Sequence, residues 1–116
     1  MLTGAPQVVR WFRVSKEISA ANHPLHVIEV LGDTAVPNAP NDYIAQLWGL
    51  PSVSTTSSVA PPATVSGIVR FSAGAHSSLF NPAPNAAVTE EMQRQTVTYA
   101  ATAGSTILIT DTSVVD

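Results

Sequence analysis

The sequence predicts an α/β domain in which short parallel strands are covered by helices. The expected order along the chain is helix, strand, helix, loop, strand, helix, strand, and this alternation is typical of parallel sheets. The length of 116 residues fits one small domain with a single core. In such a sheet the ligand site lies at the carboxyl ends of the strands, so the residues that follow each strand are the first candidates for function.

The first two elements are a helix and a strand. Residues 1–24 are expected to form an amphipathic amino-terminal helix, because apolar residues recur at three- and four-residue spacing behind Pro6. The next segment, residues 25–31 (LHVIEVL), is short and rich in β-branched side chains, which favours a buried strand. Gly32 and Asp33 follow it directly, so Asp33 lies just past the carboxyl end of this strand.

The middle of the chain is expected to contain a short helix and a long loop. The helix covers residues 42–50 (DYIAQLWGL), and Asn41 or Asp42 could cap it. Residues 51–67 consist almost entirely of Ser, Thr, Pro, Ala and Val. We expect this segment to be a flexible loop that packs no core.

The last part of the chain is expected to form a strand, a helix and a closing strand. The strand covers residues 68–71, and a glycine-containing turn after it presents His76. The helix EEMQRQTVTYAATA can be capped by Asn85 or Thr89 and ends at Gly104. Its two glutamates are expected to serve the helix dipole. The remaining sequence, STILITDTSVV, is expected to be a further strand.

Composition and charge exclude several function classes. The net charge is −3 and the five basic residues are scattered, so nucleic acid is not an expected partner. No apolar run reaches the roughly 20 residues of a membrane helix, and no export signal is found at the amino terminus. Cysteine is absent. His23 and His26 lie close together without a third ligand, so we expect neither a metal nor a cofactor.

Asp33 and His76 together suggest acid–base chemistry. A histidine that moves protons works best when a carboxylate fixes its tautomer and stabilises its cation, as in a Ser-His-Asp triad. Ser77 follows His76 directly and is the best candidate nucleophile, although no Gly-x-Ser-x-Gly elbow occurs. The alternative is structural: Asp33 could be a turn former that bonds the backbone of Ala35, and His76 an exposed loop residue.

Four stretches carry a resemblance to a known family. They are GDTAVPN, GAHSSLF, NAAVTEEMQRQTVTY and TDTSVV. Together they resemble the carboxyl-terminal end of large extracellular bacterial lipases of the α/β-hydrolase superfamily, the virulence-factor lipase group, over residues 25–116. The Asp-x-x-Val-Pro turn of that superfamily is matched by residues Asp33 to Pro37. Its Gly-x-His turn is matched by Gly74 to His76.

The resemblance implies part of an α/β-hydrolase sheet and a lipase or esterase that acts on lipids or short acyl esters. Asp33 and His76 would then be catalytic, with Ser77 as the candidate nucleophile. The missing elbow leaves two alternatives: an inactive carboxyl-terminal module that self-associates or pairs with a missing amino-terminal part, or a module that binds small apolar ligands. An uncovered sheet edge would favour a homo-oligomer. The family is secreted, whereas this sequence has no export signal, so the sequence leaves the compartment open.

Overall fold

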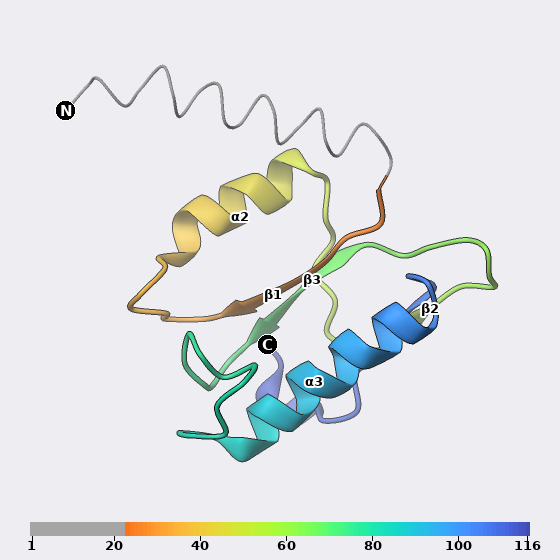
Figure 1. Ribbon diagram of the computed structural model, residues 1–116. Coiled ribbons are helices and arrows are strands. Elements are labelled where there is room, and N and C mark those ends of the chain that lie inside the picture. The colour runs from red at the N-terminus through yellow and green to blue at the C-terminus, as the bar shows by residue number, and fades with distance from the viewer. Residues whose placement is uncertain (1–22) are drawn as a thin grey trace.

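A computed structural model of the protein describes residues 23–116, which form a mixed helix-and-strand domain around a small parallel sheet (Figure 1). The elements in chain order are β1 (His26–Val30), α2 (Asn38–Leu47), β2 (Ser57–Ser58), β3 (Gly67–Phe71), α3 (Ala86–Ala101), β4 (Thr106–Ile107) and the 3₁₀ turn η2 (Thr112–Val114). The helix expected within residues 1–24 lies outside the described residues.

The parallel sheet consists of β1 and β3. They pair in register with Val30 opposite Phe71, which confirms the strands expected over residues 25–31 and 68–71. The two long helices lie on opposite faces of this pair (Figure 1). Because side chains alternate along a strand, paired residues share a face. The side chains on the apolar face, toward α3, are Ile28, Val30, Val69 and Phe71.

The core lies between this apolar face and α3. Val69 and Phe71 have no exposed surface, and they cluster with Val88 and Met92 of α3. Of the two expected caps, Asn85 is the one used, so the helix begins four residues before Glu90: the Asn85 side chain accepts hydrogen bonds from the backbone N–H groups of residues 87 and 88. The core therefore fixes α3 against the strand that precedes the His76 turn.

Helix α2 begins four residues earlier than expected. Its cap position is Pro37, no side chain caps it, and the expected caps Asn41 and Asp42 lie inside the helix. Pro40 is tolerated because the first turn of a helix needs no backbone donor there. The Asn38 side chain instead accepts a hydrogen bond from the N–H of Gly32 and donates to the carbonyl oxygen of residue 30, each at 2.8 Å. These two bonds tie the start of α2 to the end of β1.

The segment over residues 51–67 takes part in the core, contrary to expectation. Val53 is only 9% exposed and belongs to the core cluster, and its N–H donates to the carbonyl oxygen of Ile68 at 2.9 Å. Ser57 and Ser58 form β2, which pairs antiparallel with β4. Composition alone misleads here because one well-placed valine suffices to join a polar segment to a core.

The carboxyl-terminal segment is not a further parallel strand. Only Thr106 and Ile107 form a strand, and they pair antiparallel with β2 in a second small sheet. Beyond them the chain runs irregularly to a bridge between Val115 and Phe71. Ladder hydrogen bonds are therefore few in this segment, and side-chain hydrogen bonds hold it instead.

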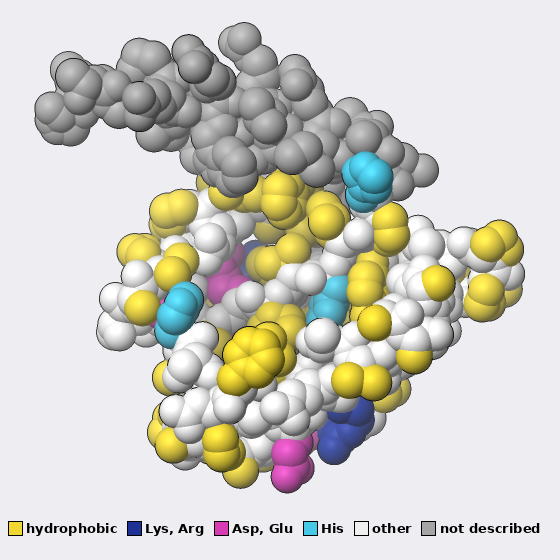
Figure 2. Space-filling model, viewed as in Figure 1, with side chains coloured by type: hydrophobic (Ala, Val, Ile, Leu, Met, Phe, Trp, Pro, Cys, Tyr) yellow, Lys and Arg dark blue, Asp and Glu magenta, His cyan; other side chains and the backbone are white. Residues whose placement is uncertain are grey.

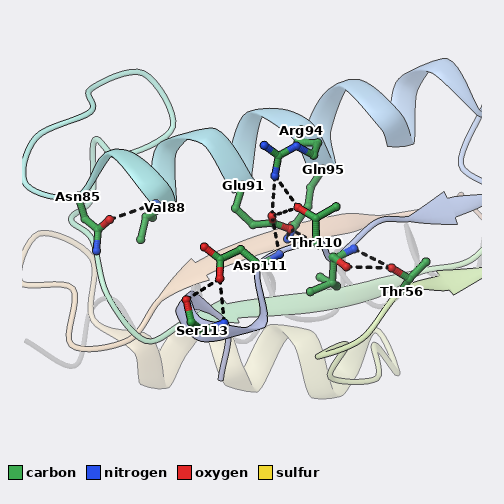
Figure 3. A network of polar contacts seen from close by, with 10 residues as sticks. Thr56, Asn85, Val88, Glu91, Arg94, Gln95, Thr110, Asp111 and Ser113 are labelled. Atoms are coloured by element: carbon green, nitrogen blue, oxygen red, sulfur yellow. Dashed lines mark hydrogen bonds and ion pairs between the residues drawn. The ribbon is translucent and has the colours of Figure 1, made fainter.

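Those bonds converge on Glu91, which lies in the middle of α3 (Figure 3). Its side chain is fully buried. It accepts hydrogen bonds from the backbone and hydroxyl of Thr110 at 3.0 and 2.6 Å, and from the backbone of Asp111 at 3.1 Å. Gln95 donates at 3.2 Å and Arg94 at 3.0 Å. The expectation that Glu91 serves the helix dipole is thus wrong, since it lies beyond the first turn and binds the carboxyl-terminal segment.

The pKa of Glu91 is set by two opposing effects. Burial alone would raise the pKa of this carboxyl, but the donors from Thr110, Gln95 and Asp111 hold it below its ordinary value. A lowered pKa means that the ionised group stabilises the fold at neutral pH. That stabilisation is lost as the pH falls from the ordinary glutamate pKa of about 4.3 through the lowered value.

We expect Glu91→Gln to reduce the free energy of unfolding by about 2–4 kcal/mol, because the amide accepts with one oxygen only and carries no charge. Urea unfolding at pH 7 measures this change. Glu90→Gln, at the exposed neighbouring position, is the matched control and should change stability by less than about 0.5 kcal/mol. The gap between wild type and Glu91→Gln should narrow below about pH 4. Equal stability of the two variants would show that the network contributes nothing.

Candidate functional site

The candidate site is a hydrogen-bonded pair formed by Asp33 and His76. Each follows a strand of the parallel sheet, and the Nδ1 of His76 lies 3.0 Å from Oδ2 of Asp33. The Asp33 side chain is 9% exposed, whereas that of His76 is 58% exposed. A carboxylate accepts from Nδ1–H, so this geometry fixes the tautomer in which Nε2 is free to take a proton.

Asp33 uses its second carboxylate oxygen in the turn after β1. Oδ1 accepts hydrogen bonds from the N–H groups of Ala35 at 2.8 Å and Val36 at 3.0 Å. The structural alternative from the sequence is thus correct for one oxygen, while the other oxygen binds His76. Because the N–H of Val36, then the His76 ring and the N–H of Ala35 all favour the ionised form, the pKa of Asp33 is lowered.

The loop that carries His76 is packed tightly against α3. Gly74 has φ +108°, and a Cβ at this position would lie 2.9 Å from Val88 Cγ1 and 3.0 Å from Ser78 Oγ. Only glycine combines this backbone angle with this close approach. The Ser78 side chain is fully buried, and its hydroxyl accepts from the N–H of Ala75 at 2.7 Å. Packing and hydrogen bonds therefore hold the loop that carries His76 in place.

The structure does not bring the Ser77 hydroxyl to His76. Ser77 is exposed, and its carbonyl oxygen accepts from the N–H groups of Phe80 and Asn81 at 3.1 and 3.0 Å. Within residues 23–116, no serine hydroxyl forms a hydrogen bond with His76. The described residues therefore assemble the carboxylate and the imidazole of a triad without a bonded nucleophile.

A cavity of about 220 Å³ opens beside the pair. Its apolar lining consists of Ile28, Val30, Val36, Leu79 and Met92. Asp33 and His76 line it together with Glu29 and Asn41. Figure 2 shows a hollow on this face of the molecule, with acidic and basic side chains lying below apolar ones. A mostly apolar cavity with a few polar groups is the usual form of a small-molecule site.

Sequence analysis missed Glu29, which also lines this cavity. Its side chain is only 2% exposed and pairs with Arg70, directly opposite on β3, at 3.1 Å. Arg70 also binds Asp42 of α2 at 3.0 Å. Burial, followed by the nearby Asp42 carboxylate, raises the pKa of Glu29, against the opposing effect of Arg70. The available signal was a lone acidic residue inside a strand expected to be buried.

His26 has a structural environment formed by two side chains of α3. Its Nε2 lies 3.1 Å from Oε1 of Gln95, and its ring lies 5.2 Å from that of Tyr99, centroid to centroid. Burial lowers the pKa of His26. In the described part of the chain, no three His, Asp or Glu side chains gather as metal ligands. None of the helices there is long and apolar enough to cross a membrane.

Comparison of the chain with protein-family models, with curated proteins and with solved structures finds no match. The candidate function therefore rests on the geometry of the Asp33–His76 pair.

We expect His76→Ala to raise the pKa of Asp33, because one donor to the carboxylate is lost. The pKa should nevertheless stay below the ordinary aspartate value of about 3.9, since the backbone donors of Ala35 and Val36 remain. Carboxyl ¹³C chemical shifts followed against pH measure this change. His23→Ala, at an exposed histidine, is the control and should leave the Asp33 pKa unaltered. An unchanged pKa in His76→Ala would show that the pair does not form in solution.

Proposed function

We propose that the protein is a lipase- or esterase-type hydrolase of carboxylic esters in which Asp33 and His76 provide the acid–base chemistry. The observation that carries the proposal is the 3.0 Å contact between Nδ1 and the carboxylate at the carboxyl edge of a parallel sheet. The resemblance of the two turns to those of extracellular bacterial lipases supports it. By the same resemblance, β1 and β3 would correspond to the last strands of an α/β-hydrolase sheet.

The two residues would have separate roles. Nε2 of His76 would take the proton of a hydroxyl nucleophile as the hydroxyl oxygen attacks the ester carbonyl carbon. The same proton would then pass to the alcohol that leaves, and water would release the acid from the acyl intermediate by the same route. Asp33 would hold the imidazole and stabilise its cation. Its lowered pKa supports this role, since the carboxylate is ionised at neutral pH.

The candidate nucleophile within the described residues is Ser77. Its hydroxyl would have to turn toward Nε2 when substrate binds, because no hydrogen bond joins them in the free protein. Catalytic hydrogen bonds often tighten only in the substrate complex. A hydroxyl supplied by a second chain is another candidate source of a nucleophile.

The cavity supports an acyl ester as the substrate class. Its apolar lining is suited to a hydrocarbon chain, and Asp33 and His76 line the same cavity. Burying an acyl chain stabilises a complex by about 0.8 kcal/mol per methylene group. A cavity of about 220 Å³ favours short acyl chains over long ones.

A second candidate function is pairing with another chain, and the open edge of β1 favours it. The carbonyl of Leu25 and the N–H of Leu31 bond to β3. Since alternate residues of a parallel strand bond to the same neighbour, the backbones of His26 and Ile28 face the opposite edge. Within residues 23–116 no strand pairs with that edge. An open edge is a template for another strand.

We expect the purified protein to hydrolyse a short-chain chromogenic ester, and His76→Ala and Asp33→Ala each to reduce kcat/KM by at least about 100-fold. His23→Ala should retain wild-type turnover. Ser77→Ala decides the nucleophile: a loss as large as that of His76→Ala assigns it to Ser77, and retained activity assigns it elsewhere. Equal turnover by wild type, His76→Ala and Asp33→Ala would refute the catalytic proposal.

Light scattering tests the second candidate. If the edge of β1 pairs with a second copy, the measured mass should rise from one chain toward two as the protein concentration increases. Ester turnover that rises more steeply than protein concentration would show that the active form contains more than one copy. A constant mass of one chain over a hundredfold concentration range would contradict self-association.

A further inference from the structure

Two buried side chains of α3 fix the position of the proton on the His26 ring. Nε2 of Gln95 donates to the Glu91 carboxylate at 3.2 Å (Figure 3). Glu91 is ionised at neutral pH, since its pKa is lowered, and a carboxylate only accepts hydrogen bonds. The Gln95 amide therefore turns its oxygen toward His26, whose Nε2 lies 3.1 Å from it. Because that oxygen accepts from Nε2–H, the neutral ring leaves Nδ1 unprotonated.

Nδ1 of His26 is an unused hydrogen-bond acceptor. It has no hydrogen-bond partner in residues 23–116. It is also not among the buried side-chain atoms that lack a partner in this part of the chain, so solvent reaches it. Burial lowers the pKa of His26, against the opposing effect of the Gln95 hydrogen bond. The ring is therefore mainly neutral at pH 7, and the lone pair of Nδ1 is available.

The His26 ring lines an open groove of about 500 Å³ between β1 and the carboxyl-terminal half of α3. The residues that line this groove include no Asp, Glu, Lys or Arg. Its apolar side chains include Leu25, Ile28 and Leu79. A charged ligand would lose hydration against such walls without gaining an ion pair. The groove therefore favours an uncharged ligand with an apolar body.

The two hydroxyl groups of the groove already donate elsewhere. The Thr96 hydroxyl donates to a backbone carbonyl oxygen of α3 at 2.9 Å. The Tyr99 hydroxyl donates to the carbonyl oxygen of Val65 at 2.7 Å. The side chains of the groove thus offer a ligand the acceptor Nδ1 of His26 and no uncommitted hydroxyl donor. A ligand without a donor would cover this acceptor and leave it unpaired, which is unfavourable.

We propose that this groove binds an uncharged ligand that has an apolar body and a hydroxyl group, and that the hydroxyl donates to Nδ1 of His26. The apolar body would cover the aliphatic side chains of the groove, and the hydroxyl would satisfy the free acceptor. His26 and His76 line different cavities. Binding in the groove therefore does not depend on ester hydrolysis.

The test compares phenol with anisole, its methyl ether, which lacks the donor. NMR titration at pH 7 measures both affinities in wild-type protein and in His26→Phe. We expect the ratio of phenol to anisole affinity to be at least about fivefold higher in wild type, which is the effect of one neutral hydrogen bond. The ratio corrects for packing changes that affect both probes. His23→Phe, at an exposed histidine, is the matched control and should keep the wild-type ratio. Equal ratios in wild type and His26→Phe, or no binding of phenol to wild type, would overturn the proposal.

A second measurement uses the wild-type protein alone. Imidazole ¹⁵N shifts should place the proton of neutral His26 on Nε2. Because the phenol hydroxyl needs the lone pair of Nδ1, phenol should lower the pKa of His26, and its affinity should fall as the pH falls through that pKa. Anisole should do neither.

Other titrating groups can be told apart from His26 in this measurement. Tyr99 faces His26 from α3, and Glu91 does so through Gln95, but the pKa of Tyr99 is raised and that of Glu91 is lowered. Neither group therefore titrates in the same pH range as an imidazole. His23→Phe removes the histidine that is nearest in sequence. A proton on Nδ1, or a His26 pKa that phenol does not move, would refute the assignment.

Discussion

The parallel pairing of β1 with β3 is the interaction on which the site depends. Its register places Val30 opposite Phe71, so the carboxyl ends of both strands lie at the same end of the sheet. Asp33 and His76 are 43 residues apart in sequence, and they meet beyond this end. The same register sets Glu29 opposite Arg70. A slip of one residue would move every side chain to the other face and separate both pairs.

The two outer edges of the β1–β3 sheet differ in whether other segments of the chain bond to them. The outer edge of β3 is covered: the N–H of Val53 donates to the carbonyl of Ile68, and the N–H of Asp116 to that of Arg70. Glu91 makes this cover possible, because it anchors the carboxyl-terminal segment to α3 from Thr110 onward. The edge of β1 has no such cover within residues 23–116. Among residues 23–116, the open edge of the β1–β3 sheet is therefore that of β1, the strand whose residues also line the cavity of the Asp33–His76 pair.

Local signals allowed part of this to be predicted from the sequence. The two strands, the Asn85 cap and the positions of Asp33 and His76 beyond strand ends follow from β-branched runs, glycines and capping residues close by in the chain. The roles of Glu91 and Glu29 could not be read in this way. Their partners lie on other elements, 19 residues away for Thr110 and 41 for Arg70. An acidic residue in isolation indicates a solvated surface or a helix start; the expected burial of its strand marks Glu29 as unusual, but only tertiary contacts reveal the partners of either glutamate.

Two carboxylates lining one cavity have pKa values displaced in opposite directions, and the contrast separates their roles. Asp33 accepts two backbone N–H groups and the His76 ring, so its pKa is lowered and it can orient a base. Burial, followed by the interaction with the Asp42 carboxyl, raises the pKa of Glu29. Environments that drive apart the pKa values of neighbouring groups are typical of functional sites. Asp33 is thus displaced toward its ionised form, which holds the His76 ring, whereas Glu29 is displaced toward its neutral form beside Asp42.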